Sequence, residues 1–434
     1  MIKQSSKKRI SFYTFGCRLN QAETAVIKNS FQAGNYQVVD FAEPADVVVV
    51  NTCTVTENGD ADTRKLVSKI NRLNPRARIA LIGCQAQIQK EKLAKLANVY
   101  WIVGNAKKFD LAEILQELDS VSTPQVIAPA IPREAFTIPV AGIDTDHTRA
   151  NIKIQDGCDF FCSFCEIPYA RGRARSREFQ NILEEARLLA AAGHREIVLT
   201  GINLGTYANA EKNILQVIEE LEKIEQLDRI RISSIEPTTI PRELIQRMAG
   251  PSKLCRYLHI PLQSGEDQIL KRMARKYTVK EFTDFMEYAK QTVPEICIGT
   301  DVIVGFPGET DEHFAATCEL LRILPLDYFH VFSYSKRSLA QSRSLTGTVP
   351  QKIIERRSQI LRELSQRKRR VFYETQLGTT QNVLFENQKN SYWFGLTDHY
   401  IRVKVRSPEN LTNQLRTTRF ERIDGQTVLG TLNG

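Results

Sequence analysis

Three cysteines within eight residues are the most chemically informative feature of this sequence. Cys158, Cys162 and Cys165 have three and then two residues between them, and no further cysteine or histidine follows closely. A structural zinc site uses four tetrahedral ligands. Three thiolates on one short loop instead suit a cubane iron–sulfur cluster whose fourth iron is open to a ligand that is not protein. The alternatives are a zinc knuckle completed from elsewhere in the chain and buried free thiols.

A second set of three cysteines is dispersed along the first quarter of the chain. Cys17, Cys53 and Cys84 each follow a short apolar run, at residues 10–15, 47–52 and 79–83, that we expect to form a strand. The carboxyl ends of parallel strands share one edge of a sheet, where ligands bind. We therefore expect these cysteines to converge on a second cluster with three protein ligands. The alternative is that they are small apolar residues at strand ends.

The elements around these cysteines predict an α/β protein in three parts. Residues 8–118 alternate short strands with amphipathic helices, which is typical of a parallel α/β domain. Residues 119–143 contain four prolines and predict an extended linker.

The part from 144 to 374 has six apolar strands, each followed by helical sequence. The strands are expected at residues 151–154, 196–200, 229–234, 257–262, 298–304 and 328–333. Six such units predict an open (β/α)6 version of the TIM-like barrel, with its working face at the carboxyl ends of the strands. The loop of Cys158 follows the first strand and would lie at that face.

Polar and glycine residues at the other strand ends predict a pocket for a nucleoside-sized ligand. The candidate cofactor-binding residues are Phe164, Gly201, Asn203, Ser234, Glu236, Gln263 and Gly305. Each could instead be an ordinary loop residue, and Phe164 could simply be packed. The three remaining cysteines, Cys255, Cys297 and Cys318, lie in apolar surroundings and are expected to be buried fillers.

Two basic segments are candidates for phosphate contact. Residues 351–370 form one predicted helix with eight cations against Glu355 and Glu363. These cations are Lys352, Arg356, Arg357, Arg362, Arg367, Lys368, Arg369 and Arg370. Arg171, Arg173, Arg175 and Arg177 follow the cysteine loop and could add phosphate or substrate contacts. A solvated helix face is the alternative for the helix.

Residues 375–434 predict a small antiparallel β-barrel. Ile401, Val403 and Val405 alternate with Arg402 and Lys404, which indicates a half-buried strand with a cationic outer face.

Composition limits the class of protein. The 434 residues are enough for two or three domains, and 42% hydrophobic with 25% charged residues is ordinary for a globular protein. A net charge of +9 indicates a polyanionic partner such as nucleic acid. No apolar run approaches the roughly 20 residues of a membrane span, and the first residues lack the apolar stretch of a signal peptide. Nine cysteines without such a signal predict a reducing compartment, so we expect a cytoplasmic protein.

The two cysteine triplets together resemble those of a known enzyme family. Cys158-x3-Cys162-x-Phe164-Cys165 resembles the radical S-adenosylmethionine signature, and Gly16-Cys17, Asn51-Thr-Cys53 and Gly83-Cys84 resemble the auxiliary-cluster domain of the methylthiotransferases. The C-terminal segment resembles the RNA-binding TRAM domain. This resemblance implies two [4Fe-4S] clusters, on Cys17, Cys53 and Cys84 and on Cys158, Cys162 and Cys165. It also implies S-adenosylmethionine bound to the open iron of the second cluster, which makes its three cysteines catalytic.

Within the family, motifs such as Ile167-Pro-Tyr-Ala-Arg-Gly and Tyr334-Ser-Lys-Arg resemble the MtaB branch. That branch acts on N6-threonylcarbamoyladenosine at position 37 of tRNA. Two places depart from its usual pattern: Asn203 stands where histidine is more common, and Ser338-Leu-Ala replaces Pro-Gly-Thr. Both lie in loops over the predicted active face.

The resemblance implies the reaction and the partners. Carbon 2 of adenine has an unactivated C–H bond that no side-chain base removes at a useful rate, so a cofactor must supply the chemistry. In the family, one S-adenosylmethionine methylates a sulfur at the auxiliary cluster, and a second gives the radical that takes the hydrogen from carbon 2. The expected partners are a tRNA anticodon loop and an electron donor such as flavodoxin or ferredoxin, with no membrane, and the chain is expected to be a monomer. The alternatives are an enzyme for N6-isopentenyladenosine or a ribosomal protein side chain, and a non-catalytic iron–sulfur RNA-binding protein.

Overall fold

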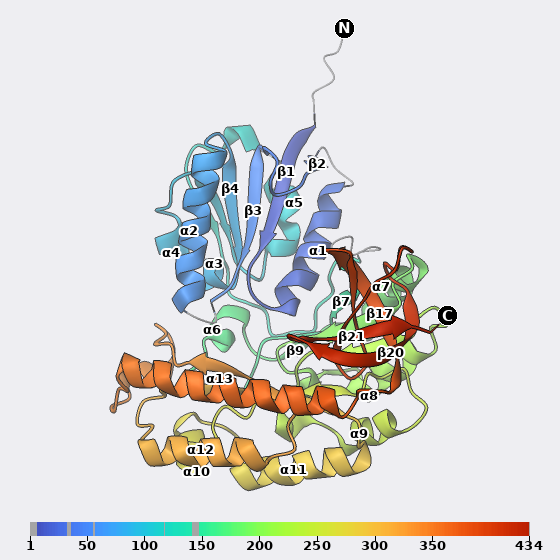
Figure 1. Ribbon diagram of the computed structural model, residues 1–434. Helices are drawn as coiled ribbons and strands as arrows, with labels where there is room; N and C mark the ends of the chain where they lie inside the picture. The colour runs from blue at the N-terminus through green and yellow to red at the C-terminus, as the bar shows by residue number, and fades with distance from the viewer. Residues whose placement is uncertain (1–6, 33–35, 55–56, 117, 141–146, 434) are drawn as a thin grey trace.

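The N-terminal part of the computed structural model is a six-stranded, fully parallel sheet (Figure 1). The structure describes residues 7–32, 36–54, 57–116, 118–140 and 147–433. The strand order is β2 (Tyr36–Val38), β1 (Lys8–Thr14), β3 (Val47–Thr52), β4 (Arg78–Gly83), β5 (Val99–Val103), β6 (Gln125–Ile127). All three predicted strands are present, and three more complete the sheet.

Helices cover both faces of this sheet. α1 (Arg18–Gln32) and α5 (Leu111–Ile114) pack with one set of alternating strand residues, such as Val47 and Val49. α2 (Glu57–Leu73), α3 (Cys84–Ile88) and α4 (Lys90–Leu93) pack with the other set, such as Val48 and Val50. Strands buried on both faces explain the unbroken apolar runs of the sequence.

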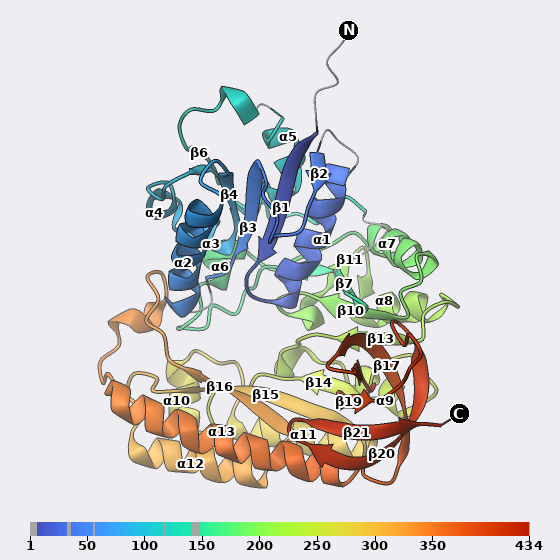
Figure 2. The same ribbon diagram turned by 45° about the horizontal axis from the view of Figure 1, so that its top comes forward.

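The central part contains the six predicted strands in two parallel groups of three (Figure 2). The first group has the order β13 (Arg229–Ile232), β10 (Glu196–Thr200), β7 (Ala150–Lys153). The second has the order β14 (Tyr257–His259), β15 (Cys297–Val304), β16 (Tyr328–Ser333). Backbone bonds of Ile230 to Lys253 and Cys255 join the two groups. The predicted partial (β/α)6 barrel is therefore confirmed.

The helices outside this barrel follow local sequence signals. They are α7 (Phe179–Ala191), α8 (Ile214–Glu222), α9 (Arg242–Ala249), α10 (Asp267–Arg272), α11 (Val279–Thr292), α12 (Asp311–Ile323) and α13 (Gln351–Glu374). Thr278 and Glu281 form a capping box at the start of α11. Gly193, with φ of 99°, follows the end of α7, where a left-handed residue ends a helix at little cost.

The C-terminal residues form the predicted small β-barrel, which is closed and five-stranded, but it is not wholly antiparallel because the strands at 402–405 and 427–432 pair in parallel. Its order is β17 (Thr380–Lys389), β18 (Tyr392–Leu396), β19 (Arg402–Val405), β21 (Thr427–Leu432), β20 (Leu415–Asp424). Val403 and Val405 are buried in it, whereas Arg402 is exposed. The chain therefore has α/β architecture with an all-β C-terminal part.

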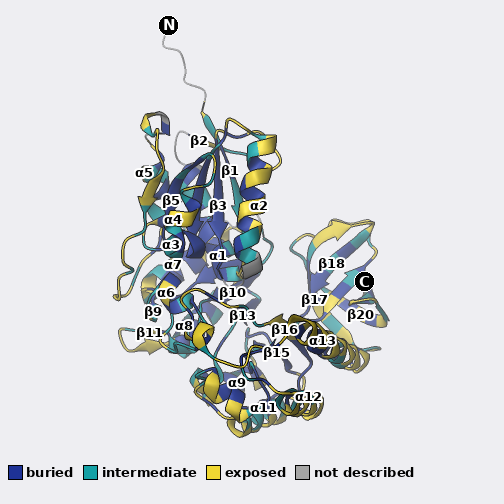
Figure 3. Cartoon of the chain, turned by 90° about the vertical axis from the view of Figure 1, so that its left-hand side faces the viewer, coloured by how far each residue is buried: buried dark blue, intermediate teal, exposed yellow. Residues whose placement is uncertain are grey.

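This small barrel is fastened to the amino ends of the central strands. Arg229 donates to the carbonyl oxygens of Leu396 and Asn382 at 2.9 and 2.7 Å, and Arg231 donates to those of Asp398 and Thr397 at 2.8 and 3.0 Å. Arg231 is fully buried and also pairs with Glu196 at 2.6 Å. Figure 3 shows the small barrel beside α13.

The predicted linker is extended, and β6, which lies in it, pairs with β5 of the N-terminal sheet. The predicted boundary at 143/144 lies outside the described residues. No helix in the described ranges is long and apolar enough to cross a bilayer.

Candidate active site between two cysteine triplets

The loop after β7 brings three sulfur atoms together. Cys158, Cys162 and Cys165 lie between β8 (Gln155–Asp156) and α6 (Ile167–Arg171). Burial, together with the nearby sulfurs of Cys162 and Cys158, raises the pKa of Cys165 to about 12. Burial also raises the pKa of Cys158 to about 11. Thiols that oppose one another's ionisation in this way would be stabilised as thiolates by a shared cation.

Hydrogen-bond donors are already aimed at these sulfurs. The backbone N–H groups of Phe160 and Ile167 donate to Cys158 and Cys165, each at 3.4 Å. Arg275 Nη1 donates to Cys162 Sγ at 3.2 Å. Such donors favour the charged form of each thiol, so the loop suits a cationic iron–sulfur centre.

The second triplet lies where the parallel sheet was expected to place it. Cys17, Cys53 and Cys84 follow β1, β3 and β4 directly or within three residues. Cys17 is exposed, yet desolvation of its thiol and the charge of Cys84 both raise its pKa, so these two sulfurs are close. A Cβ atom on Gly16 would lie 2.7 Å from Cys53 Sγ, and the φ of this glycine is 92°. The structure thus brings all three strand ends to one edge.

No three His, Cys, Asp or Glu side chains of the described residues are arranged as ligands of a single metal ion. An iron–sulfur cluster needs a different arrangement, because it carries each of its thiolates on a separate iron.

The two triplets face each other across α3 and α6. Asn105 Nδ2 donates to the carbonyl of Ala170 at 2.7 Å and lies 3.7 Å from Cys84 Sγ. Asn105 therefore contacts one cysteine of the N-terminal sheet and the helix that begins two residues after Cys165.

Arg337 joins the same two loops from the other side. Its Nε donates to Glu166 at 2.9 Å and its Nη2 to Thr54 Oγ1 at 2.7 Å, while its Nη1 pairs with Asp60 at 2.9 Å. Glu166 follows Cys165, and Thr54 follows Cys53. The Glu166 carboxylate also accepts bonds from Ser338 Oγ at 3.1 Å and Leu339 N at 2.7 Å. The sequence segment that departs from the MtaB pattern is thus anchored to the cysteine loop.

A buried ion cluster lies beneath both triplets. The carboxylate of Glu23, on α1, contacts Lys108 at 2.5 Å, Lys153 at 2.7 Å and Arg171 at 2.9 Å, and all four side chains are at most 2% exposed. Burial opposes ionisation of Glu23, but these three cations outweigh it and hold its pKa well below the ordinary value.

This cluster carries more positive than negative charge. Asp156 is its second carboxylate, and it contacts Lys153, Arg171 and Arg175 at 2.6, 3.0 and 3.2 Å. Four cations therefore surround two carboxylates. Burial, aided by neighbouring cations, lowers the pKa of Lys108 to about 8. Because Arg171 acts electrostatically on Cys17 and Cys84, the excess charge suits anionic thiolates and a bound cluster there.

These contacts correct the expectation that the arginines after the cysteine loop contact phosphate. Arg171 is buried against Glu23, and Arg177 against Glu185. Arg175 pairs with Asp156. Arg173, by contrast, is exposed and so is its partner Asp159 at 3.3 Å, so a phosphate or substrate contact stays a prediction for this residue. Arg171 and Arg175 instead pair with Asp156, which lies two residues before Cys158.

The predicted pocket residues fall into two groups. Glu236 pairs with Arg275, which bonds Cys162, and burial raises the pKa of Glu236. Asn203 is buried, and its Nδ2 has no hydrogen-bond partner among the described residues. Gly201 leaves room for Gln155 Oε1, which would lie 2.9 Å from an added Cβ. These three residues line one region beside the cysteine loop.

The other predicted residues have structural surroundings. Phe164 packs with Ile269, Met273 and Phe306 in an apolar cluster. Gly305 has a φ of 78°, and a side chain at this position would collide with Ile354 of α13. Gln263 has a φ of 71°, and its backbone N–H and C=O groups form hydrogen bonds with the backbone of β15. Ser234 is half-buried with no side-chain bond among the described residues.

The sequence did not identify Arg275, Arg337, Asn105 or Glu23 as site residues. Each is a single polar residue in a helix or loop, and neither its burial nor its partners can be read from the sequence, even for Glu23, which follows Cys17 closely. The only signal was Lys336-Arg337 within the motif that begins at Tyr334.

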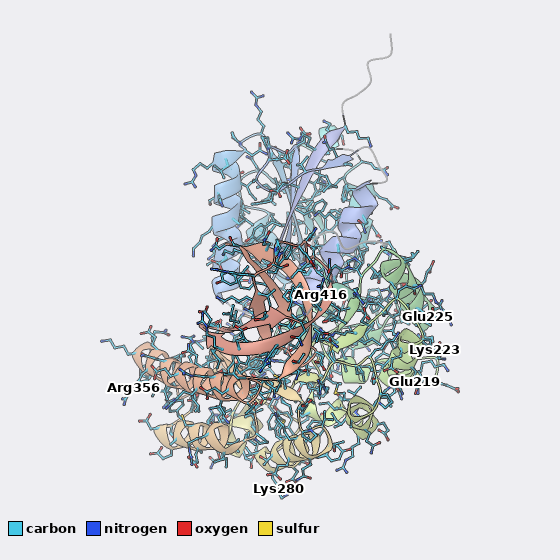
Figure 4. The ribbon with its side chains drawn as sticks, turned by 45° about the vertical axis from the view of Figure 1, so that its right-hand side comes forward. Glu219, Lys223, Glu225, Lys280, Arg356 and Arg416 are labelled. Atoms are coloured by element: carbon cyan, nitrogen blue, oxygen red, sulfur yellow. The ribbon has the colours of Figure 1, made fainter. Side chains whose placement is uncertain are left out.

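The basic helix α13 is partly structural. Arg357 is buried and pairs with Glu309 at 2.8 Å, and Lys368 donates to the carbonyl of Leu324. The cations that remain exposed are Lys352, Arg356, Arg362, Arg367 and Arg370. Figure 4 shows Arg356 projecting from the surface of the helix.

Comparison with known proteins agrees with both halves of the site. The radical SAM superfamily matches residues 152–321, and the family described as uncharacterized protein family UPF0004 matches residues 9–104. The threonylcarbamoyladenosine tRNA methylthiotransferase MtaB of Aquifex aeolicus (strain VF5) is 39% identical, covering 91% of this chain and 96% of its own. The tRNA-2-methylthio-N(6)-dimethylallyladenosine synthase of Acetivibrio thermocellus is 32% identical, covering 89% of this chain and 82% of its own.

The fold also has a relative among solved structures. The radical S-adenosylmethionine methyltransferase TsrM of Kitasatospora setae superimposes with a TM-score of 0.57 at 16% identity, covering 75% of each chain. This likeness concerns the fold alone.

Proposed function

Because the chain belongs to the tRNA methylthiotransferase family of radical S-adenosylmethionine enzymes, we propose that it adds a methylthio group to carbon 2 of N6-threonylcarbamoyladenosine at position 37 of tRNA. The observation that carries the proposal is the joining of two cysteine triplets by Asn105 and Arg337. The substrate rests on the relative from Aquifex aeolicus, whose identity and coverage exceed those of the dimethylallyladenosine relative.

The six cysteines would hold the two clusters. Cys158, Cys162 and Cys165 would bind the cluster that takes S-adenosylmethionine, and Cys17, Cys53 and Cys84 would bind the auxiliary cluster. When bound, these groups supply the electron that cleaves S-adenosylmethionine and the sulfur that is transferred.

The residues of the chain then orient and shield these groups. Arg275 and two backbone N–H groups stabilise the negative charge of the first triplet. The buried ion cluster around Glu23 places excess positive charge beside the second. Asn203, with its unused Nδ2, and Gly201 are the best supported contacts for S-adenosylmethionine. Glu236 and Ser234 border the same space. Phe164, Gln263 and Gly305 would support the residues that line it.

The substrate would be an anticodon loop whose target base is turned out of the stack, as sequence-specific RNA recognition usually requires. The exposed cations of α13 and of the C-terminal barrel suit its phosphates.

We place the enzyme in the cytoplasm as a monomer, with a flavodoxin or ferredoxin as electron donor. We divide it at 8–118, 144–374 and 375–434, with a linker at 119–143.

Nucleoside mass analysis of tRNA from a deletion strain tests the substrate. We expect the 2-methylthio-threonylcarbamoyl nucleoside to disappear, its unthiolated precursor to accumulate, and the 2-methylthio-isopentenyl nucleoside to remain. Loss of the isopentenyl product alone would assign the other branch. If neither nucleoside changed, modification of a ribosomal protein or non-catalytic RNA binding would replace the proposal.

Arg337 should act as a positioning residue for the paired clusters. We expect Arg337→Gln to lower methylthiolated RNA about tenfold to a hundredfold, since displacement by about 1 Å costs that much in oriented reactions. Formation of 5′-deoxyadenosine should fall much less, so the ratio of the two products is the measurement. Arg322→Gln, which removes an exposed arginine that pairs with Glu319 on α12, is the matched control. An unchanged product ratio in Arg337→Gln would contradict this role.

A further inference from the structure

A small cavity lies at the amino ends of β15 and β16, and one of its lining residues, Tyr400, accepts a hydrogen bond from Arg18 at 3.1 Å. The cavity measures about 260 Å³ and lies between β16, α13 and the C-terminal barrel. Tyr328, His330, Arg369, Tyr400 and Arg402 are among its lining residues. We call it the cationic cavity.

The walls of the cationic cavity lack negative charge. Arg369 stacks over Tyr328, with its guanidinium carbon 4.6 Å from the ring centre. Among the described residues, no carboxylate forms an ion pair with Arg369 or Arg402. Burial lowers the pKa of His330, and the positive charges of His259, Arg369 and Arg402 lower it further, opposed by Asp301 alone. A bound anion would supply the missing charge.

A polar wall connects the cysteine loop with this cavity. Arg275 bonds Cys162 and pairs with Glu236. Asp301 is close enough to Glu236 to affect its pKa. His259 Nε2 lies 2.9 Å from Asp301 Oδ1. Asp301 is paired in register with His330, which lines the cavity. This series of contacts therefore runs from the cysteine loop towards the two arginines.

We propose that the cationic cavity binds the carboxylate of the amino-acid substituent on N6 of the target adenine, with Arg369 and Arg402 as its ligands. This inference rests on the proposed function. Carbon 2 must lie near the cysteine loop, and N6 is separated from it across N1, so a substituent on N6 extends away from the reacting atom. The threonylcarbamoyl group ends in a carboxylate, which arginine binds strongly.

The same feature would exclude the dimethylallyl substrate of the related enzymes. That substituent has no charge, so it would leave the half-buried Arg369 and the exposed Arg402 without a counter-ion in the cavity. A site built around polar partners discriminates strongly against an analogue that lacks them.

Binding of anticodon stem-loop RNA to the anaerobically reconstituted full chain tests the proposal. Three RNAs are compared: one with threonylcarbamoyladenosine, one with the threonine carboxylate converted to an uncharged amide, and one with unmodified adenosine. In Arg369→Gln/Arg402→Gln, we expect the dissociation constant for the first RNA to rise about tenfold to a hundredfold, the range for lost bonds to a charged group. The other two RNAs should change less than twofold. Arg369→Lys/Arg402→Lys should keep part of the preference.

The matched control is Lys223→Gln/Lys280→Gln, which removes two exposed cations that do not line the cavity and that lie at the surface in Figure 4. Iron content and thermal unfolding check that each variant is folded and loaded. Equal loss of affinity for all three RNAs would overturn the proposal in favour of an RNA phosphate in the cavity. No loss for any RNA, or a wild-type chain that does not prefer the carboxylate, would also overturn it. If the wild type methylthiolated only isopentenyl RNA, the proposed function itself would fail.

Discussion

Cys158→Ala should abolish reductive cleavage of S-adenosylmethionine. The structure places Cys158 with Cys162 and Cys165 on one loop, and a cluster that has only three protein ligands would be held by two thiolates after the substitution, too few to retain it. We expect 5′-deoxyadenosine formation to fall below detection and about half of the bound iron to be lost. The measurement is anaerobic turnover with a chemical reductant, together with iron analysis.

Cys318→Ala is the control for this variant, because Cys318 is half-buried against the barrel core and away from both triplets. It should keep full iron and full turnover. If Cys158→Ala formed 5′-deoxyadenosine at the wild-type rate, the assignment of this triplet would be wrong. A wild-type chain holding one cluster only would remove the auxiliary site.

The second large effect is expected on stability, from Glu23→Gln. Glu23 is fully buried and balances Lys108, Lys153 and Arg171. Removing one partner of a buried ion pair leaves the others uncompensated and typically costs about 3–5 kcal/mol. We expect the free energy of unfolding, measured by urea denaturation of the cluster-free chain, to fall by about that amount.

The pH dependence of stability gives an independent reading of the same residue. The pKa of Glu23 is depressed in the folded chain, so its contribution is complete above its unfolded value of about 4.3 and is lost as pH falls through the lower folded value. Glu23→Gln should lack this acid-labile part. Glu43→Gln, at the exposed pair with Arg9, should cost less than about 1 kcal/mol. Similar losses in both variants would contradict the role of the buried cluster.

The convergence of the six cysteines could be predicted because it follows from local rules. Cys17, Cys53 and Cys84 end strands whose apolar runs are plain in sequence, and parallel strands share their carboxyl edge. The loop of Cys158 follows a strand of a second parallel array for the same reason. The β-barrel was predictable from the period of two at Ile401, Val403 and Val405.

What holds the two triplets against each other could not be predicted in this way. Glu23 lies on a helix and Arg171 lies in a loop–helix segment 148 residues away, so only the packing of α1 against β7 makes them partners. The arginines from Arg171 to Arg177 looked like phosphate ligands because sequence shows charge without showing burial. Arg337 is separated from Thr54 by 283 residues, and its role depends on that tertiary contact.

The attachment of the C-terminal barrel has a consequence for the newly made protein. Arg229 and Arg231 lie in the third strand of the central barrel, yet four of the carbonyl oxygens that they bond belong to residues 382–398. While the ribosome is still translating that segment, the emerging barrel has two arginines at its lower end whose partners do not yet exist. Domains generally fold in order as they emerge, but here the middle part cannot complete its hydrogen bonding until nearly the whole chain has been made. A chain released before residue 382 would contain a central barrel in which Arg229 and Arg231 lack these four hydrogen bonds.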